Sequence, residues 1–101
     1  MPTPLSNPQK RYLRGLAHDL KPIVMVGAKG VTAPLVAELG LALEQHELVK
    51  VKVAAEDRDT RDAWIAELGE KTEATLVSRI GHTAVFYRRS NDKPLVILPK
   101  G

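Results

Sequence analysis

One cation stands between two glycines in the segment Gly27-Ala28-Lys29-Gly30. A glycine carries no Cβ, so the backbone at both ends of this segment can come close to a ligand. The apolar residues 23–26 that precede it predict a buried strand, and Thr32 with Pro34 predicts the start of a helix directly after it. The positive end of that helix dipole would point back at the segment, so the pattern predicts a site for a phosphate group.

The spacing of these glycines excludes two common nucleotide-binding loops. A triphosphate-binding loop is longer and has its lysine after the second glycine, and the dinucleotide fingerprint needs a third glycine. What remains is a GxxG segment, which in KH domains clamps a nucleic-acid backbone. There it joins two helices, whereas here it joins a strand to a helix, so the likeness is one of mechanism. A tight turn that needs a positive φ explains the same glycines, and the spacing leaves both interpretations open.

A second candidate site lies on the helix predicted near the N-terminus. Lys10, Arg14 and His18 recur at every fourth residue and so project from one side of the helix, with Arg11 beside them. Like charges at this spacing repel one another by about 0.2–0.5 kcal/mol per pair. A helix that carries this repulsion without interleaved acids indicates an anionic partner, although a solvated helix face would show the same row. The other candidate anion-binding residues are Lys21, Arg79, His82, Arg88 and Arg89.

Charge is unevenly distributed along the chain, whose formal net charge is +3. Residues 1–30 hold five basic side chains against one acidic, residues 31–74 hold five against ten, and residues 75–101 hold five against one. If the two ends of the chain meet in the fold, one face is basic and the other acidic. Such a surface suits a polyanion, because neutralised phosphates release counterions. The alternative interpretation is that these charges are only solvated and bind no partner.

No pattern of residues indicates catalysis or metal binding. The sequence has no cysteine, and its three histidines lack metal-like spacing, so we expect no metal and no cofactor. The acidic segment 56–62 lacks the glycine and final glutamate of a calcium loop, and capping of the next helix explains it. None of the serines lies in a nucleophile motif, so we expect a protein that is not an enzyme.

Length and composition predict one domain. A chain of 101 residues, 44% of them hydrophobic, supports a single core. We expect residues 1–5 to form a flexible tail and residues 6–99 to form the domain. No apolar run approaches the ~20 residues of a membrane span, and no signal pattern opens the chain. The sequence therefore predicts a cytoplasmic monomer that does not contact membranes.

Hydrophobic periodicity predicts the element order α-β-α-β-α-β-β. The first helix starts at Ser6-Asn7-Pro8 and ends before Pro22, and its apolar face consists of Leu13, Leu16, Ala17 and Leu20. The next elements are strand 23–26, helix 32–46 and strand 49–53. A helix follows the polar loop 56–60, and its buried side consists of Ala63, Trp64, Ile65 and Leu68. Strands 75–80 and 83–87 are then joined by a Gly81-His82 turn, and a short extended piece follows at 95–98. This order predicts an α/β (α+β sandwich) fold with a four-stranded mixed sheet packed by helices.

Four stretches together resemble the CRM domain, the chloroplast RNA splicing and ribosome maturation domain. Residues 9–22 resemble its opening helix, 27–32 its GxxG loop, 42–52 its middle signature and 81–88 its closing hairpin. The likeness runs from about residue 6 to residue 99, and a single-domain chain of this length is similar to the stand-alone bacterial YhbY-type members. Ala28 departs from the pattern, because family loops often carry a polar or basic residue there.

This resemblance implies a fold akin to the C-terminal domain of translation initiation factor three. It also implies RNA binding and association with ribosomal RNA in precursors of the large ribosomal subunit. The family's loop glycines carry over to Gly27 and Gly30, and its basic first helix carries over to Lys10, Arg11 and Arg14. We therefore predict a ribosome assembly factor that holds RNA backbone through the loop and the first helix.

Two other functions fit the same residues. The acidic middle of the chain suits a protein-interaction module that docks on a ribosomal protein without any RNA affinity of its own. An enzyme acting on a small phosphorylated substrate at the loop would need a general base, and His18 is the one candidate. The RNA-binding prediction implies that Gly30→Asp weakens RNA binding without unfolding the domain.

Overall fold

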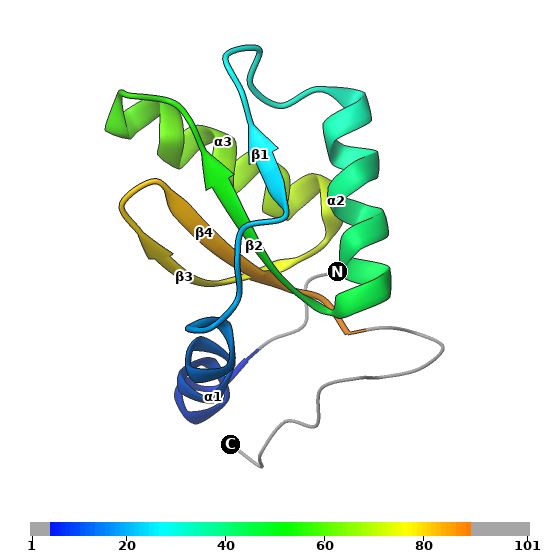
Figure 1. Ribbon diagram of the computed structural model, residues 1–101, viewed down its shortest axis with the longest axis vertical. Helices are drawn as coiled ribbons and strands as arrows, with labels where there is room; N and C mark the ends of the chain where they lie inside the picture. Colours follow the sequence, from blue (N-terminus) through cyan, green and yellow to red (C-terminus); the bar gives the residue numbers. More distant parts are fainter. Residues whose placement is uncertain (1–4, 90–101) are drawn as a thin grey trace.

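The computed structural model describes residues 5–89, which contain seven elements (Figure 1). Their order is α1 (Asn7–Ala17), β1 (Val24–Val26), α2 (Ala33–His46), β2 (Leu48–Val53), α3 (Arg58–Thr72), β3 (Thr75–Ile80) and β4 (Thr83–Tyr87). The predicted order of helices and strands is thus confirmed. The piece predicted at 95–98 and residues 1–4 of the predicted tail lie outside the described residues. No helix in the described range is both long and apolar enough to cross a membrane.

The four strands form one mixed sheet in the order β1-β2-β4-β3. β1 runs parallel to β2, whereas β4 is antiparallel to both β2 and β3. The last described strand, β4, therefore lies between two strands made before it. Gly81 and His82 form the predicted two-residue turn, and Gly81 supplies its positive φ of 57°.

Helices cover both faces of the sheet, because apolar side chains point to both sides of β2 and β4. On one face, Val49, Val51 and Val53 pack with the buried residues of α2 and α3. On the other face, α1 packs its buried residues on Leu48 and Tyr87. Figure 1 shows α1 at one end of this second face, away from the end where the β1–α2 loop lies. Among residues 5–89, no helix covers the part of this face beyond α1, and we call this part the open face.

Each helix begins at a polar cap that satisfies its first backbone donors. Ser6 and Gln9 form a reciprocal capping box at α1, with bonds of 3.2 and 3.0 Å. Thr32 caps α2 by accepting from the Leu35 N–H at 3.3 Å, as its sequence position predicts. Asp57, from the predicted polar loop, caps α3. These caps fix where each helix starts and hence where the loops before them lie.

Asp57 makes the start of α3 sensitive to acid. The Thr60 N–H and hydroxyl both donate to its carboxylate at 3.0 Å, and these bonds hold the pKa of Asp57 below its usual 3.8. A lowered pKa stabilises the fold above pH 3.8, and this stabilisation is lost as the pH falls through the folded-state pKa. We expect Asp57→Asn to unfold in less urea than the parent near neutral pH and to converge with it in strong acid. A gap that stays constant with pH would contradict this.

Three predictions about buried surfaces were wrong in part. β1 is a short strand at the edge of the sheet, so Val24 and Val26 are buried while Met25 is 60% exposed. α1 ends at Ala17 rather than near Pro22, so Leu20 lies beyond the helix and is exposed, and Leu16 within the helix is exposed as well. Ala63 on α3 is exposed as well.

Candidate nucleic-acid interface

The GxxG segment forms a tight turn between β1 and α2, at the opposite end of the molecule from α1 (Figure 1). The Gly30 N–H donates to the Gly27 carbonyl at 3.0 Å, so Ala28 and Lys29 are the central residues of the turn. Both central residues are exposed. The Lys29 cation is therefore available to an anion at the tip of the turn.

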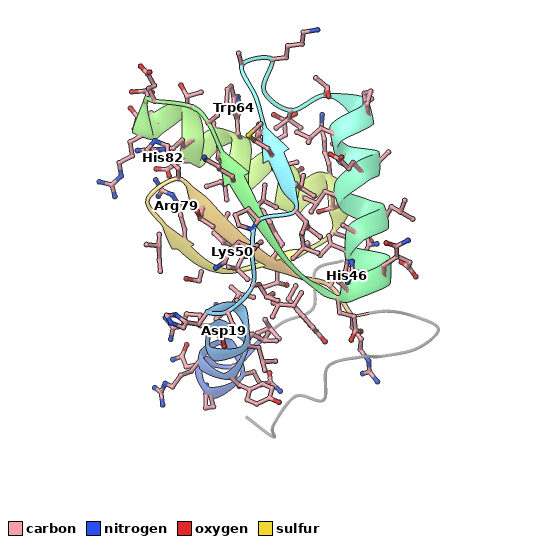
Figure 2. All side chains as sticks on the ribbon, viewed as in Figure 1. Asp19, His46, Lys50, Trp64, Arg79 and His82 are labelled. Carbon is pink, nitrogen blue, oxygen red and sulfur yellow. The ribbon has the colours of Figure 1, made fainter. Side chains whose placement is uncertain are left out.

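The two glycines of this turn have different structural roles. Gly30 has a φ of 72°, and a Cβ placed on it would lie 2.9 Å from the indole ring of Trp64. Gly27 does not have a positive φ, and a Cβ there would meet no atom within 4 Å. Gly30 is thus required by backbone conformation and by close packing, whereas the space at Gly27 is open to a ligand. Figure 2 shows Trp64 on α3 beneath this end of the molecule.

This geometry overturns one expectation about the loop. The substitution Gly30→Asp was expected to leave the fold intact, yet any side chain at Gly30 would strain the backbone and meet the Trp64 ring. The sequence placed Trp64 on the core side of its helix, where it is half-buried against the core. The contact between Trp64 and Gly30 depends on how α3 packs against the loop, and no pattern in the sequence predicted it. Gly27 is consequently the better position at which to test ligand binding.

The start of α2 offers fewer donors to a phosphate than a helix terminus usually does. Pro34 has no N–H, and the Leu35 N–H is already bonded to Thr32. The Val36 N–H donates to the Thr32 carbonyl at 3.0 Å. Within the described chain this leaves Ala33 as the first-turn donor for a ligand, so an anion at the loop would depend mainly on Lys29 and the turn itself.

The basic row on α1 is solvent-facing, as its spacing predicts. Arg11, Arg14 and His18 are exposed and Lys10 is half-buried. None of the ion pairs within residues 5–89 involves a side chain of this row. Within the described part of the chain, the charges on α1 therefore have no acidic partner at ion-pair distance and are available to a polyanion. Lys21, which follows α1, is exposed too.

The fold brings Lys50 and Lys52 into the space between α1 and the loop. Both lysines lie on β2 and point to the sheet face that α1 partly covers, because the alternate residues Val49, Val51 and Val53 point to the other face. Figure 2 shows Lys50 between α1 and the open part of the sheet. Sequence reasoning missed these lysines as site residues. The alternation of lysine with valine was their signal, since it marks a strand with one polar face.

Arg79 and His82 lie together near the β3–β4 turn, facing the start of α3 (Figure 2). Arg79 forms an ion pair with Asp62 at 2.5 Å, and Arg61 donates from Nη1 to Nε2 of His82 at 2.6 Å. Both predicted site residues thus have polar partners from α3 in the free protein. A phosphate at this turn would have to compete with those partners.

Arg88 joins three elements at the other end of the sheet. Its guanidinium donates to the carbonyls of Thr72 at 2.8 Å and Gly40 at 2.9 Å, and to the Glu44 carboxylate at 3.1 Å. These contacts connect the end of β4 to both α2 and α3. In the free protein Arg88 therefore stabilises the packing of β4 with α2 and α3, whereas its neighbour Arg89 is exposed.

We expect Arg88→Ala to lower the free energy of unfolding by about 1–3 kcal/mol, because it leaves two half-buried carbonyls without their donor. Arg89→Ala is the matched control, and an exposed side chain of this kind changes stability by no more than about 0.5 kcal/mol. Urea unfolding of the two variants measures the difference. Equal stabilities would mean that the Arg88 contacts contribute nothing.

The described residues bring together cations rather than catalytic groups. No cluster of His, Asp and Glu within residues 5–89 has the composition to hold a metal ion. His18 is exposed and is the C-cap residue of α1, whereas the GxxG turn lies at the far end of the molecule, so the fold separates this candidate base from the loop (Figure 1). The arrangement is suited to binding an extended anion.

Known proteins of similar sequence carry names that describe RNA binding. A Haemophilus influenzae protein named as an RNA-binding protein is 48% identical over 90 residues, covering 89% of this chain and 91% of its own length. The Bacillus subtilis protein YqeI, named as a probable RNA-binding protein, is 36% identical and covers 94% of this chain and 99% of its own length. A Pseudomonas aeruginosa protein with the same kind of name is 42% identical over 90 residues, or 89% of this chain and 86% of its own.

A solved structure has the same fold. The solution structure of the Staphylococcus aureus protein SAV1595 superposes with a TM-score of 0.82 at 36% sequence identity, covering 95% of this chain and all of that one. The model of the CRS1/YhbY (CRM) domain matches residues 5–88, which include every described helix and strand. With the GxxG turn between β1 and α2 and the basic α1 in place, the chain belongs to the CRS1/YhbY (CRM) domain family.

Proposed function

We propose that this protein binds ribosomal RNA in precursors of the large ribosomal subunit and acts there, in the cytoplasm, as an assembly factor without catalytic activity. The observation that carries RNA binding is the row of cations on α1, which form no ion pair with any acid of residues 5–89, together with the exposed Lys29 at the GxxG turn. Names of relatives that describe RNA binding support the same partner. The ribosomal part of the proposal rests on the resemblance to the family.

The proposed mode of binding is recognition of RNA backbone and shape. Lys and Arg side chains neutralise phosphates without reading the sequence. The chain has four aromatic residues, and those on β4, Phe86 and Tyr87, are buried, so the exposed sheet offers no aromatic stacking platform. The binding residues in this proposal are Lys10, Arg11, Arg14, His18, Lys21, Gly27, Ala28, Lys29 and Gly30, with Arg79, His82, Arg88 and Arg89 contributing where they exchange protein partners for phosphate.

Ultraviolet crosslinking in cells, followed by sequencing of the bound RNA, tests the proposal. We expect crosslinks concentrated in precursors of the large-subunit RNA, and we expect them to decrease in Lys29→Ala. Crosslinks spread over messenger RNA would contradict the ribosomal assignment. An RNA affinity that does not change with salt, together with tight binding to a ribosomal protein, would instead favour the protein-interaction module.

A further inference from the structure

We infer that the open face of the sheet is a second RNA-binding surface, which takes an unpaired segment of RNA and connects the basic helix α1 to the GxxG turn. The inference rests on the proposed RNA binding and extends it, because it names the surface between the two predicted sites and the form of RNA that fits there.

A groove separates α1 from the open part of the sheet. It has a volume of about 490 Å³ and is lined from α1 by Arg14 and His18 and from the strands by Lys50, Ser78 and Thr83. This volume falls within the ~300–1,000 Å³ typical of clefts that hold a small molecule. The groove is thus large enough for a nucleotide and too small for a double helix.

The groove offers positive charge without a compensating acid. No acidic side chain of residues 5–89 lines it, whereas Arg14 and Lys50 bring two cations to its walls. The hydroxyl groups of Ser78 and Thr83 add hydrogen-bonding groups to its floor. Charge of one sign around a cleft concentrates ligands of the opposite sign, so the chemistry of the groove favours a phosphodiester.

The open face continues from this groove to the GxxG turn. Strand register places Met25, Lys52, Thr83 and Ile80 in one row across β1, β2, β4 and β3. Met25 is 60% exposed and Ile80 is 79% exposed, at the two edges of that row. Met25 lies two residues before Gly27, so the row ends beside the turn. Lys50 and Lys52 are two residues apart on β2, or about 6.6 Å.

An unpaired RNA segment suits this mixture of cations and apolar side chains. Its phosphates can contact Lys50 and Lys52, while the flat faces of unstacked bases can cover Met25 and Ile80. A duplex keeps its bases stacked inside and would leave both apolar side chains in water. A peptide of acidic residues alone, such as oligoglutamate, would satisfy the lysines but has no planar apolar groups for the edges of the row. We therefore assign the surface to single-stranded RNA with little base preference.

The double variant Lys50→Gln/Lys52→Gln tests the inference, with Arg58→Gln/Lys71→Gln on α3 as a control of equal charge. The probes are an oligouridylate of about 12 nucleotides, within the usual range of single-strand sites, and a blunt RNA duplex of equal length. We expect the double variant to bind the oligouridylate about tenfold more weakly, with the slope of log affinity against log salt reduced by about 1.4. Duplex binding, and all binding by the control, should stay within about twofold of the parent.

Ile80→Ser provides a second test that does not change the charge. Because Ile80 is 79% exposed, its replacement should leave the thermal unfolding temperature unchanged. We expect about threefold weaker binding of the oligouridylate with an unchanged salt slope, since only van der Waals contact with a base is lost.

The outcomes separate this inference from the proposed function. If the parent binds both probes with a steep salt dependence, but the Lys50/Lys52 variant matches the control, the inference is overturned and RNA binding stands. Equal losses for single strand and duplex would overturn the assignment to unpaired RNA. Tighter binding of an oligoglutamate peptide than of either RNA would overturn it in favour of an acidic protein. If the parent binds neither RNA, the proposed function itself fails.

Discussion

Gly30→Ala is expected to lower the free energy of unfolding by about 2–5 kcal/mol. A left-handed φ costs a residue with a Cβ about 1–2 kcal/mol, and forcing a methyl group against a packed ring adds about 1–3 kcal/mol. The φ of Gly30 is 72°, and the added Cβ would lie 2.9–3.0 Å from three atoms of the Trp64 indole. Few single methyl groups elsewhere in the described chain should cost as much.

Gly27→Ala is the matched control in the same turn. Its φ is outside the positive range, and its Cβ would have no neighbour within 4 Å, so we expect a change within about 0.5 kcal/mol. Chemical denaturation gives the free energies, and the double variant Gly30→Ala/Trp64→Leu isolates the steric part. If shortening Trp64 restores none of the stability lost in Gly30→Ala, the ring contact is not the cause. Equal stability of the two alanine variants would contradict the whole assignment of Gly30.

The largest effect on binding is expected from removing the charges of α1. The triple variant Lys10→Gln/Arg11→Gln/Arg14→Gln should bind single-stranded RNA on the order of 100-fold more weakly at low salt, because three phosphate contacts and their released counterions are lost. The slope of log affinity against log salt should fall by about 2. Fluorescence anisotropy of a labelled RNA across a salt series measures both quantities.

A triple variant on α3, Arg58→Gln/Arg61→Gln/Lys71→Gln, has the same net charge and controls for long-range attraction. We expect its affinity and salt slope to stay close to those of the parent. The α1 variant should fold at least as well as the parent, since it relieves the repulsion between Lys10 and Arg14, worth about 0.2–0.5 kcal/mol. If both triple variants lose affinity equally, RNA responds only to net charge and α1 is not a specific contact surface.

Local patterns predicted much of this fold correctly. Helix caps at Thr32 and in the segment 56–60, the alternation in β2 and the Gly81-His82 turn are each set by residues a few positions apart. Such features are visible in a sequence because a cap or a turn depends on neighbouring backbone groups. The number and order of the elements followed from them.

Relations across the sheet could not be predicted in the same way. β1 and β3 form the two edges of the sheet, and Met25 on β1 is exposed because it points to the face that α1 covers only in part. Strand order depends on how distant segments bury one another, and hydrophobic periodicity contains no such information. The partners of Arg88 and the contact between Gly30 and Trp64 were hidden for the same reason.

The candidate site, too, was predictable in its local features but not in the relative positions of its parts. The exposed cations of α1 and Lys29 followed from spacing alone, but their location at opposite ends of the molecule did not. The charge distribution suggested one basic face if the two ends of the chain meet, whereas the fold separates α1 from the turn by the sheet face with Lys50 and Lys52. Only the assembled sheet shows that those lysines lie between the two.

The strand order also bears on how a nascent chain folds during translation. β1, β2 and β3 leave the ribosome first, but β2 and β3 cannot join until β4 has been synthesised and lies between them. Until then the edge of β2 that β4 will cover is an unpaired template for foreign strands. The two-residue turn at Gly81-His82 keeps this interval short, because each residue added between β3 and β4 would lengthen it by about 0.05–0.2 s of synthesis. Once β4 is complete, the hairpin can close in about 1–10 μs and add to β2 as a unit.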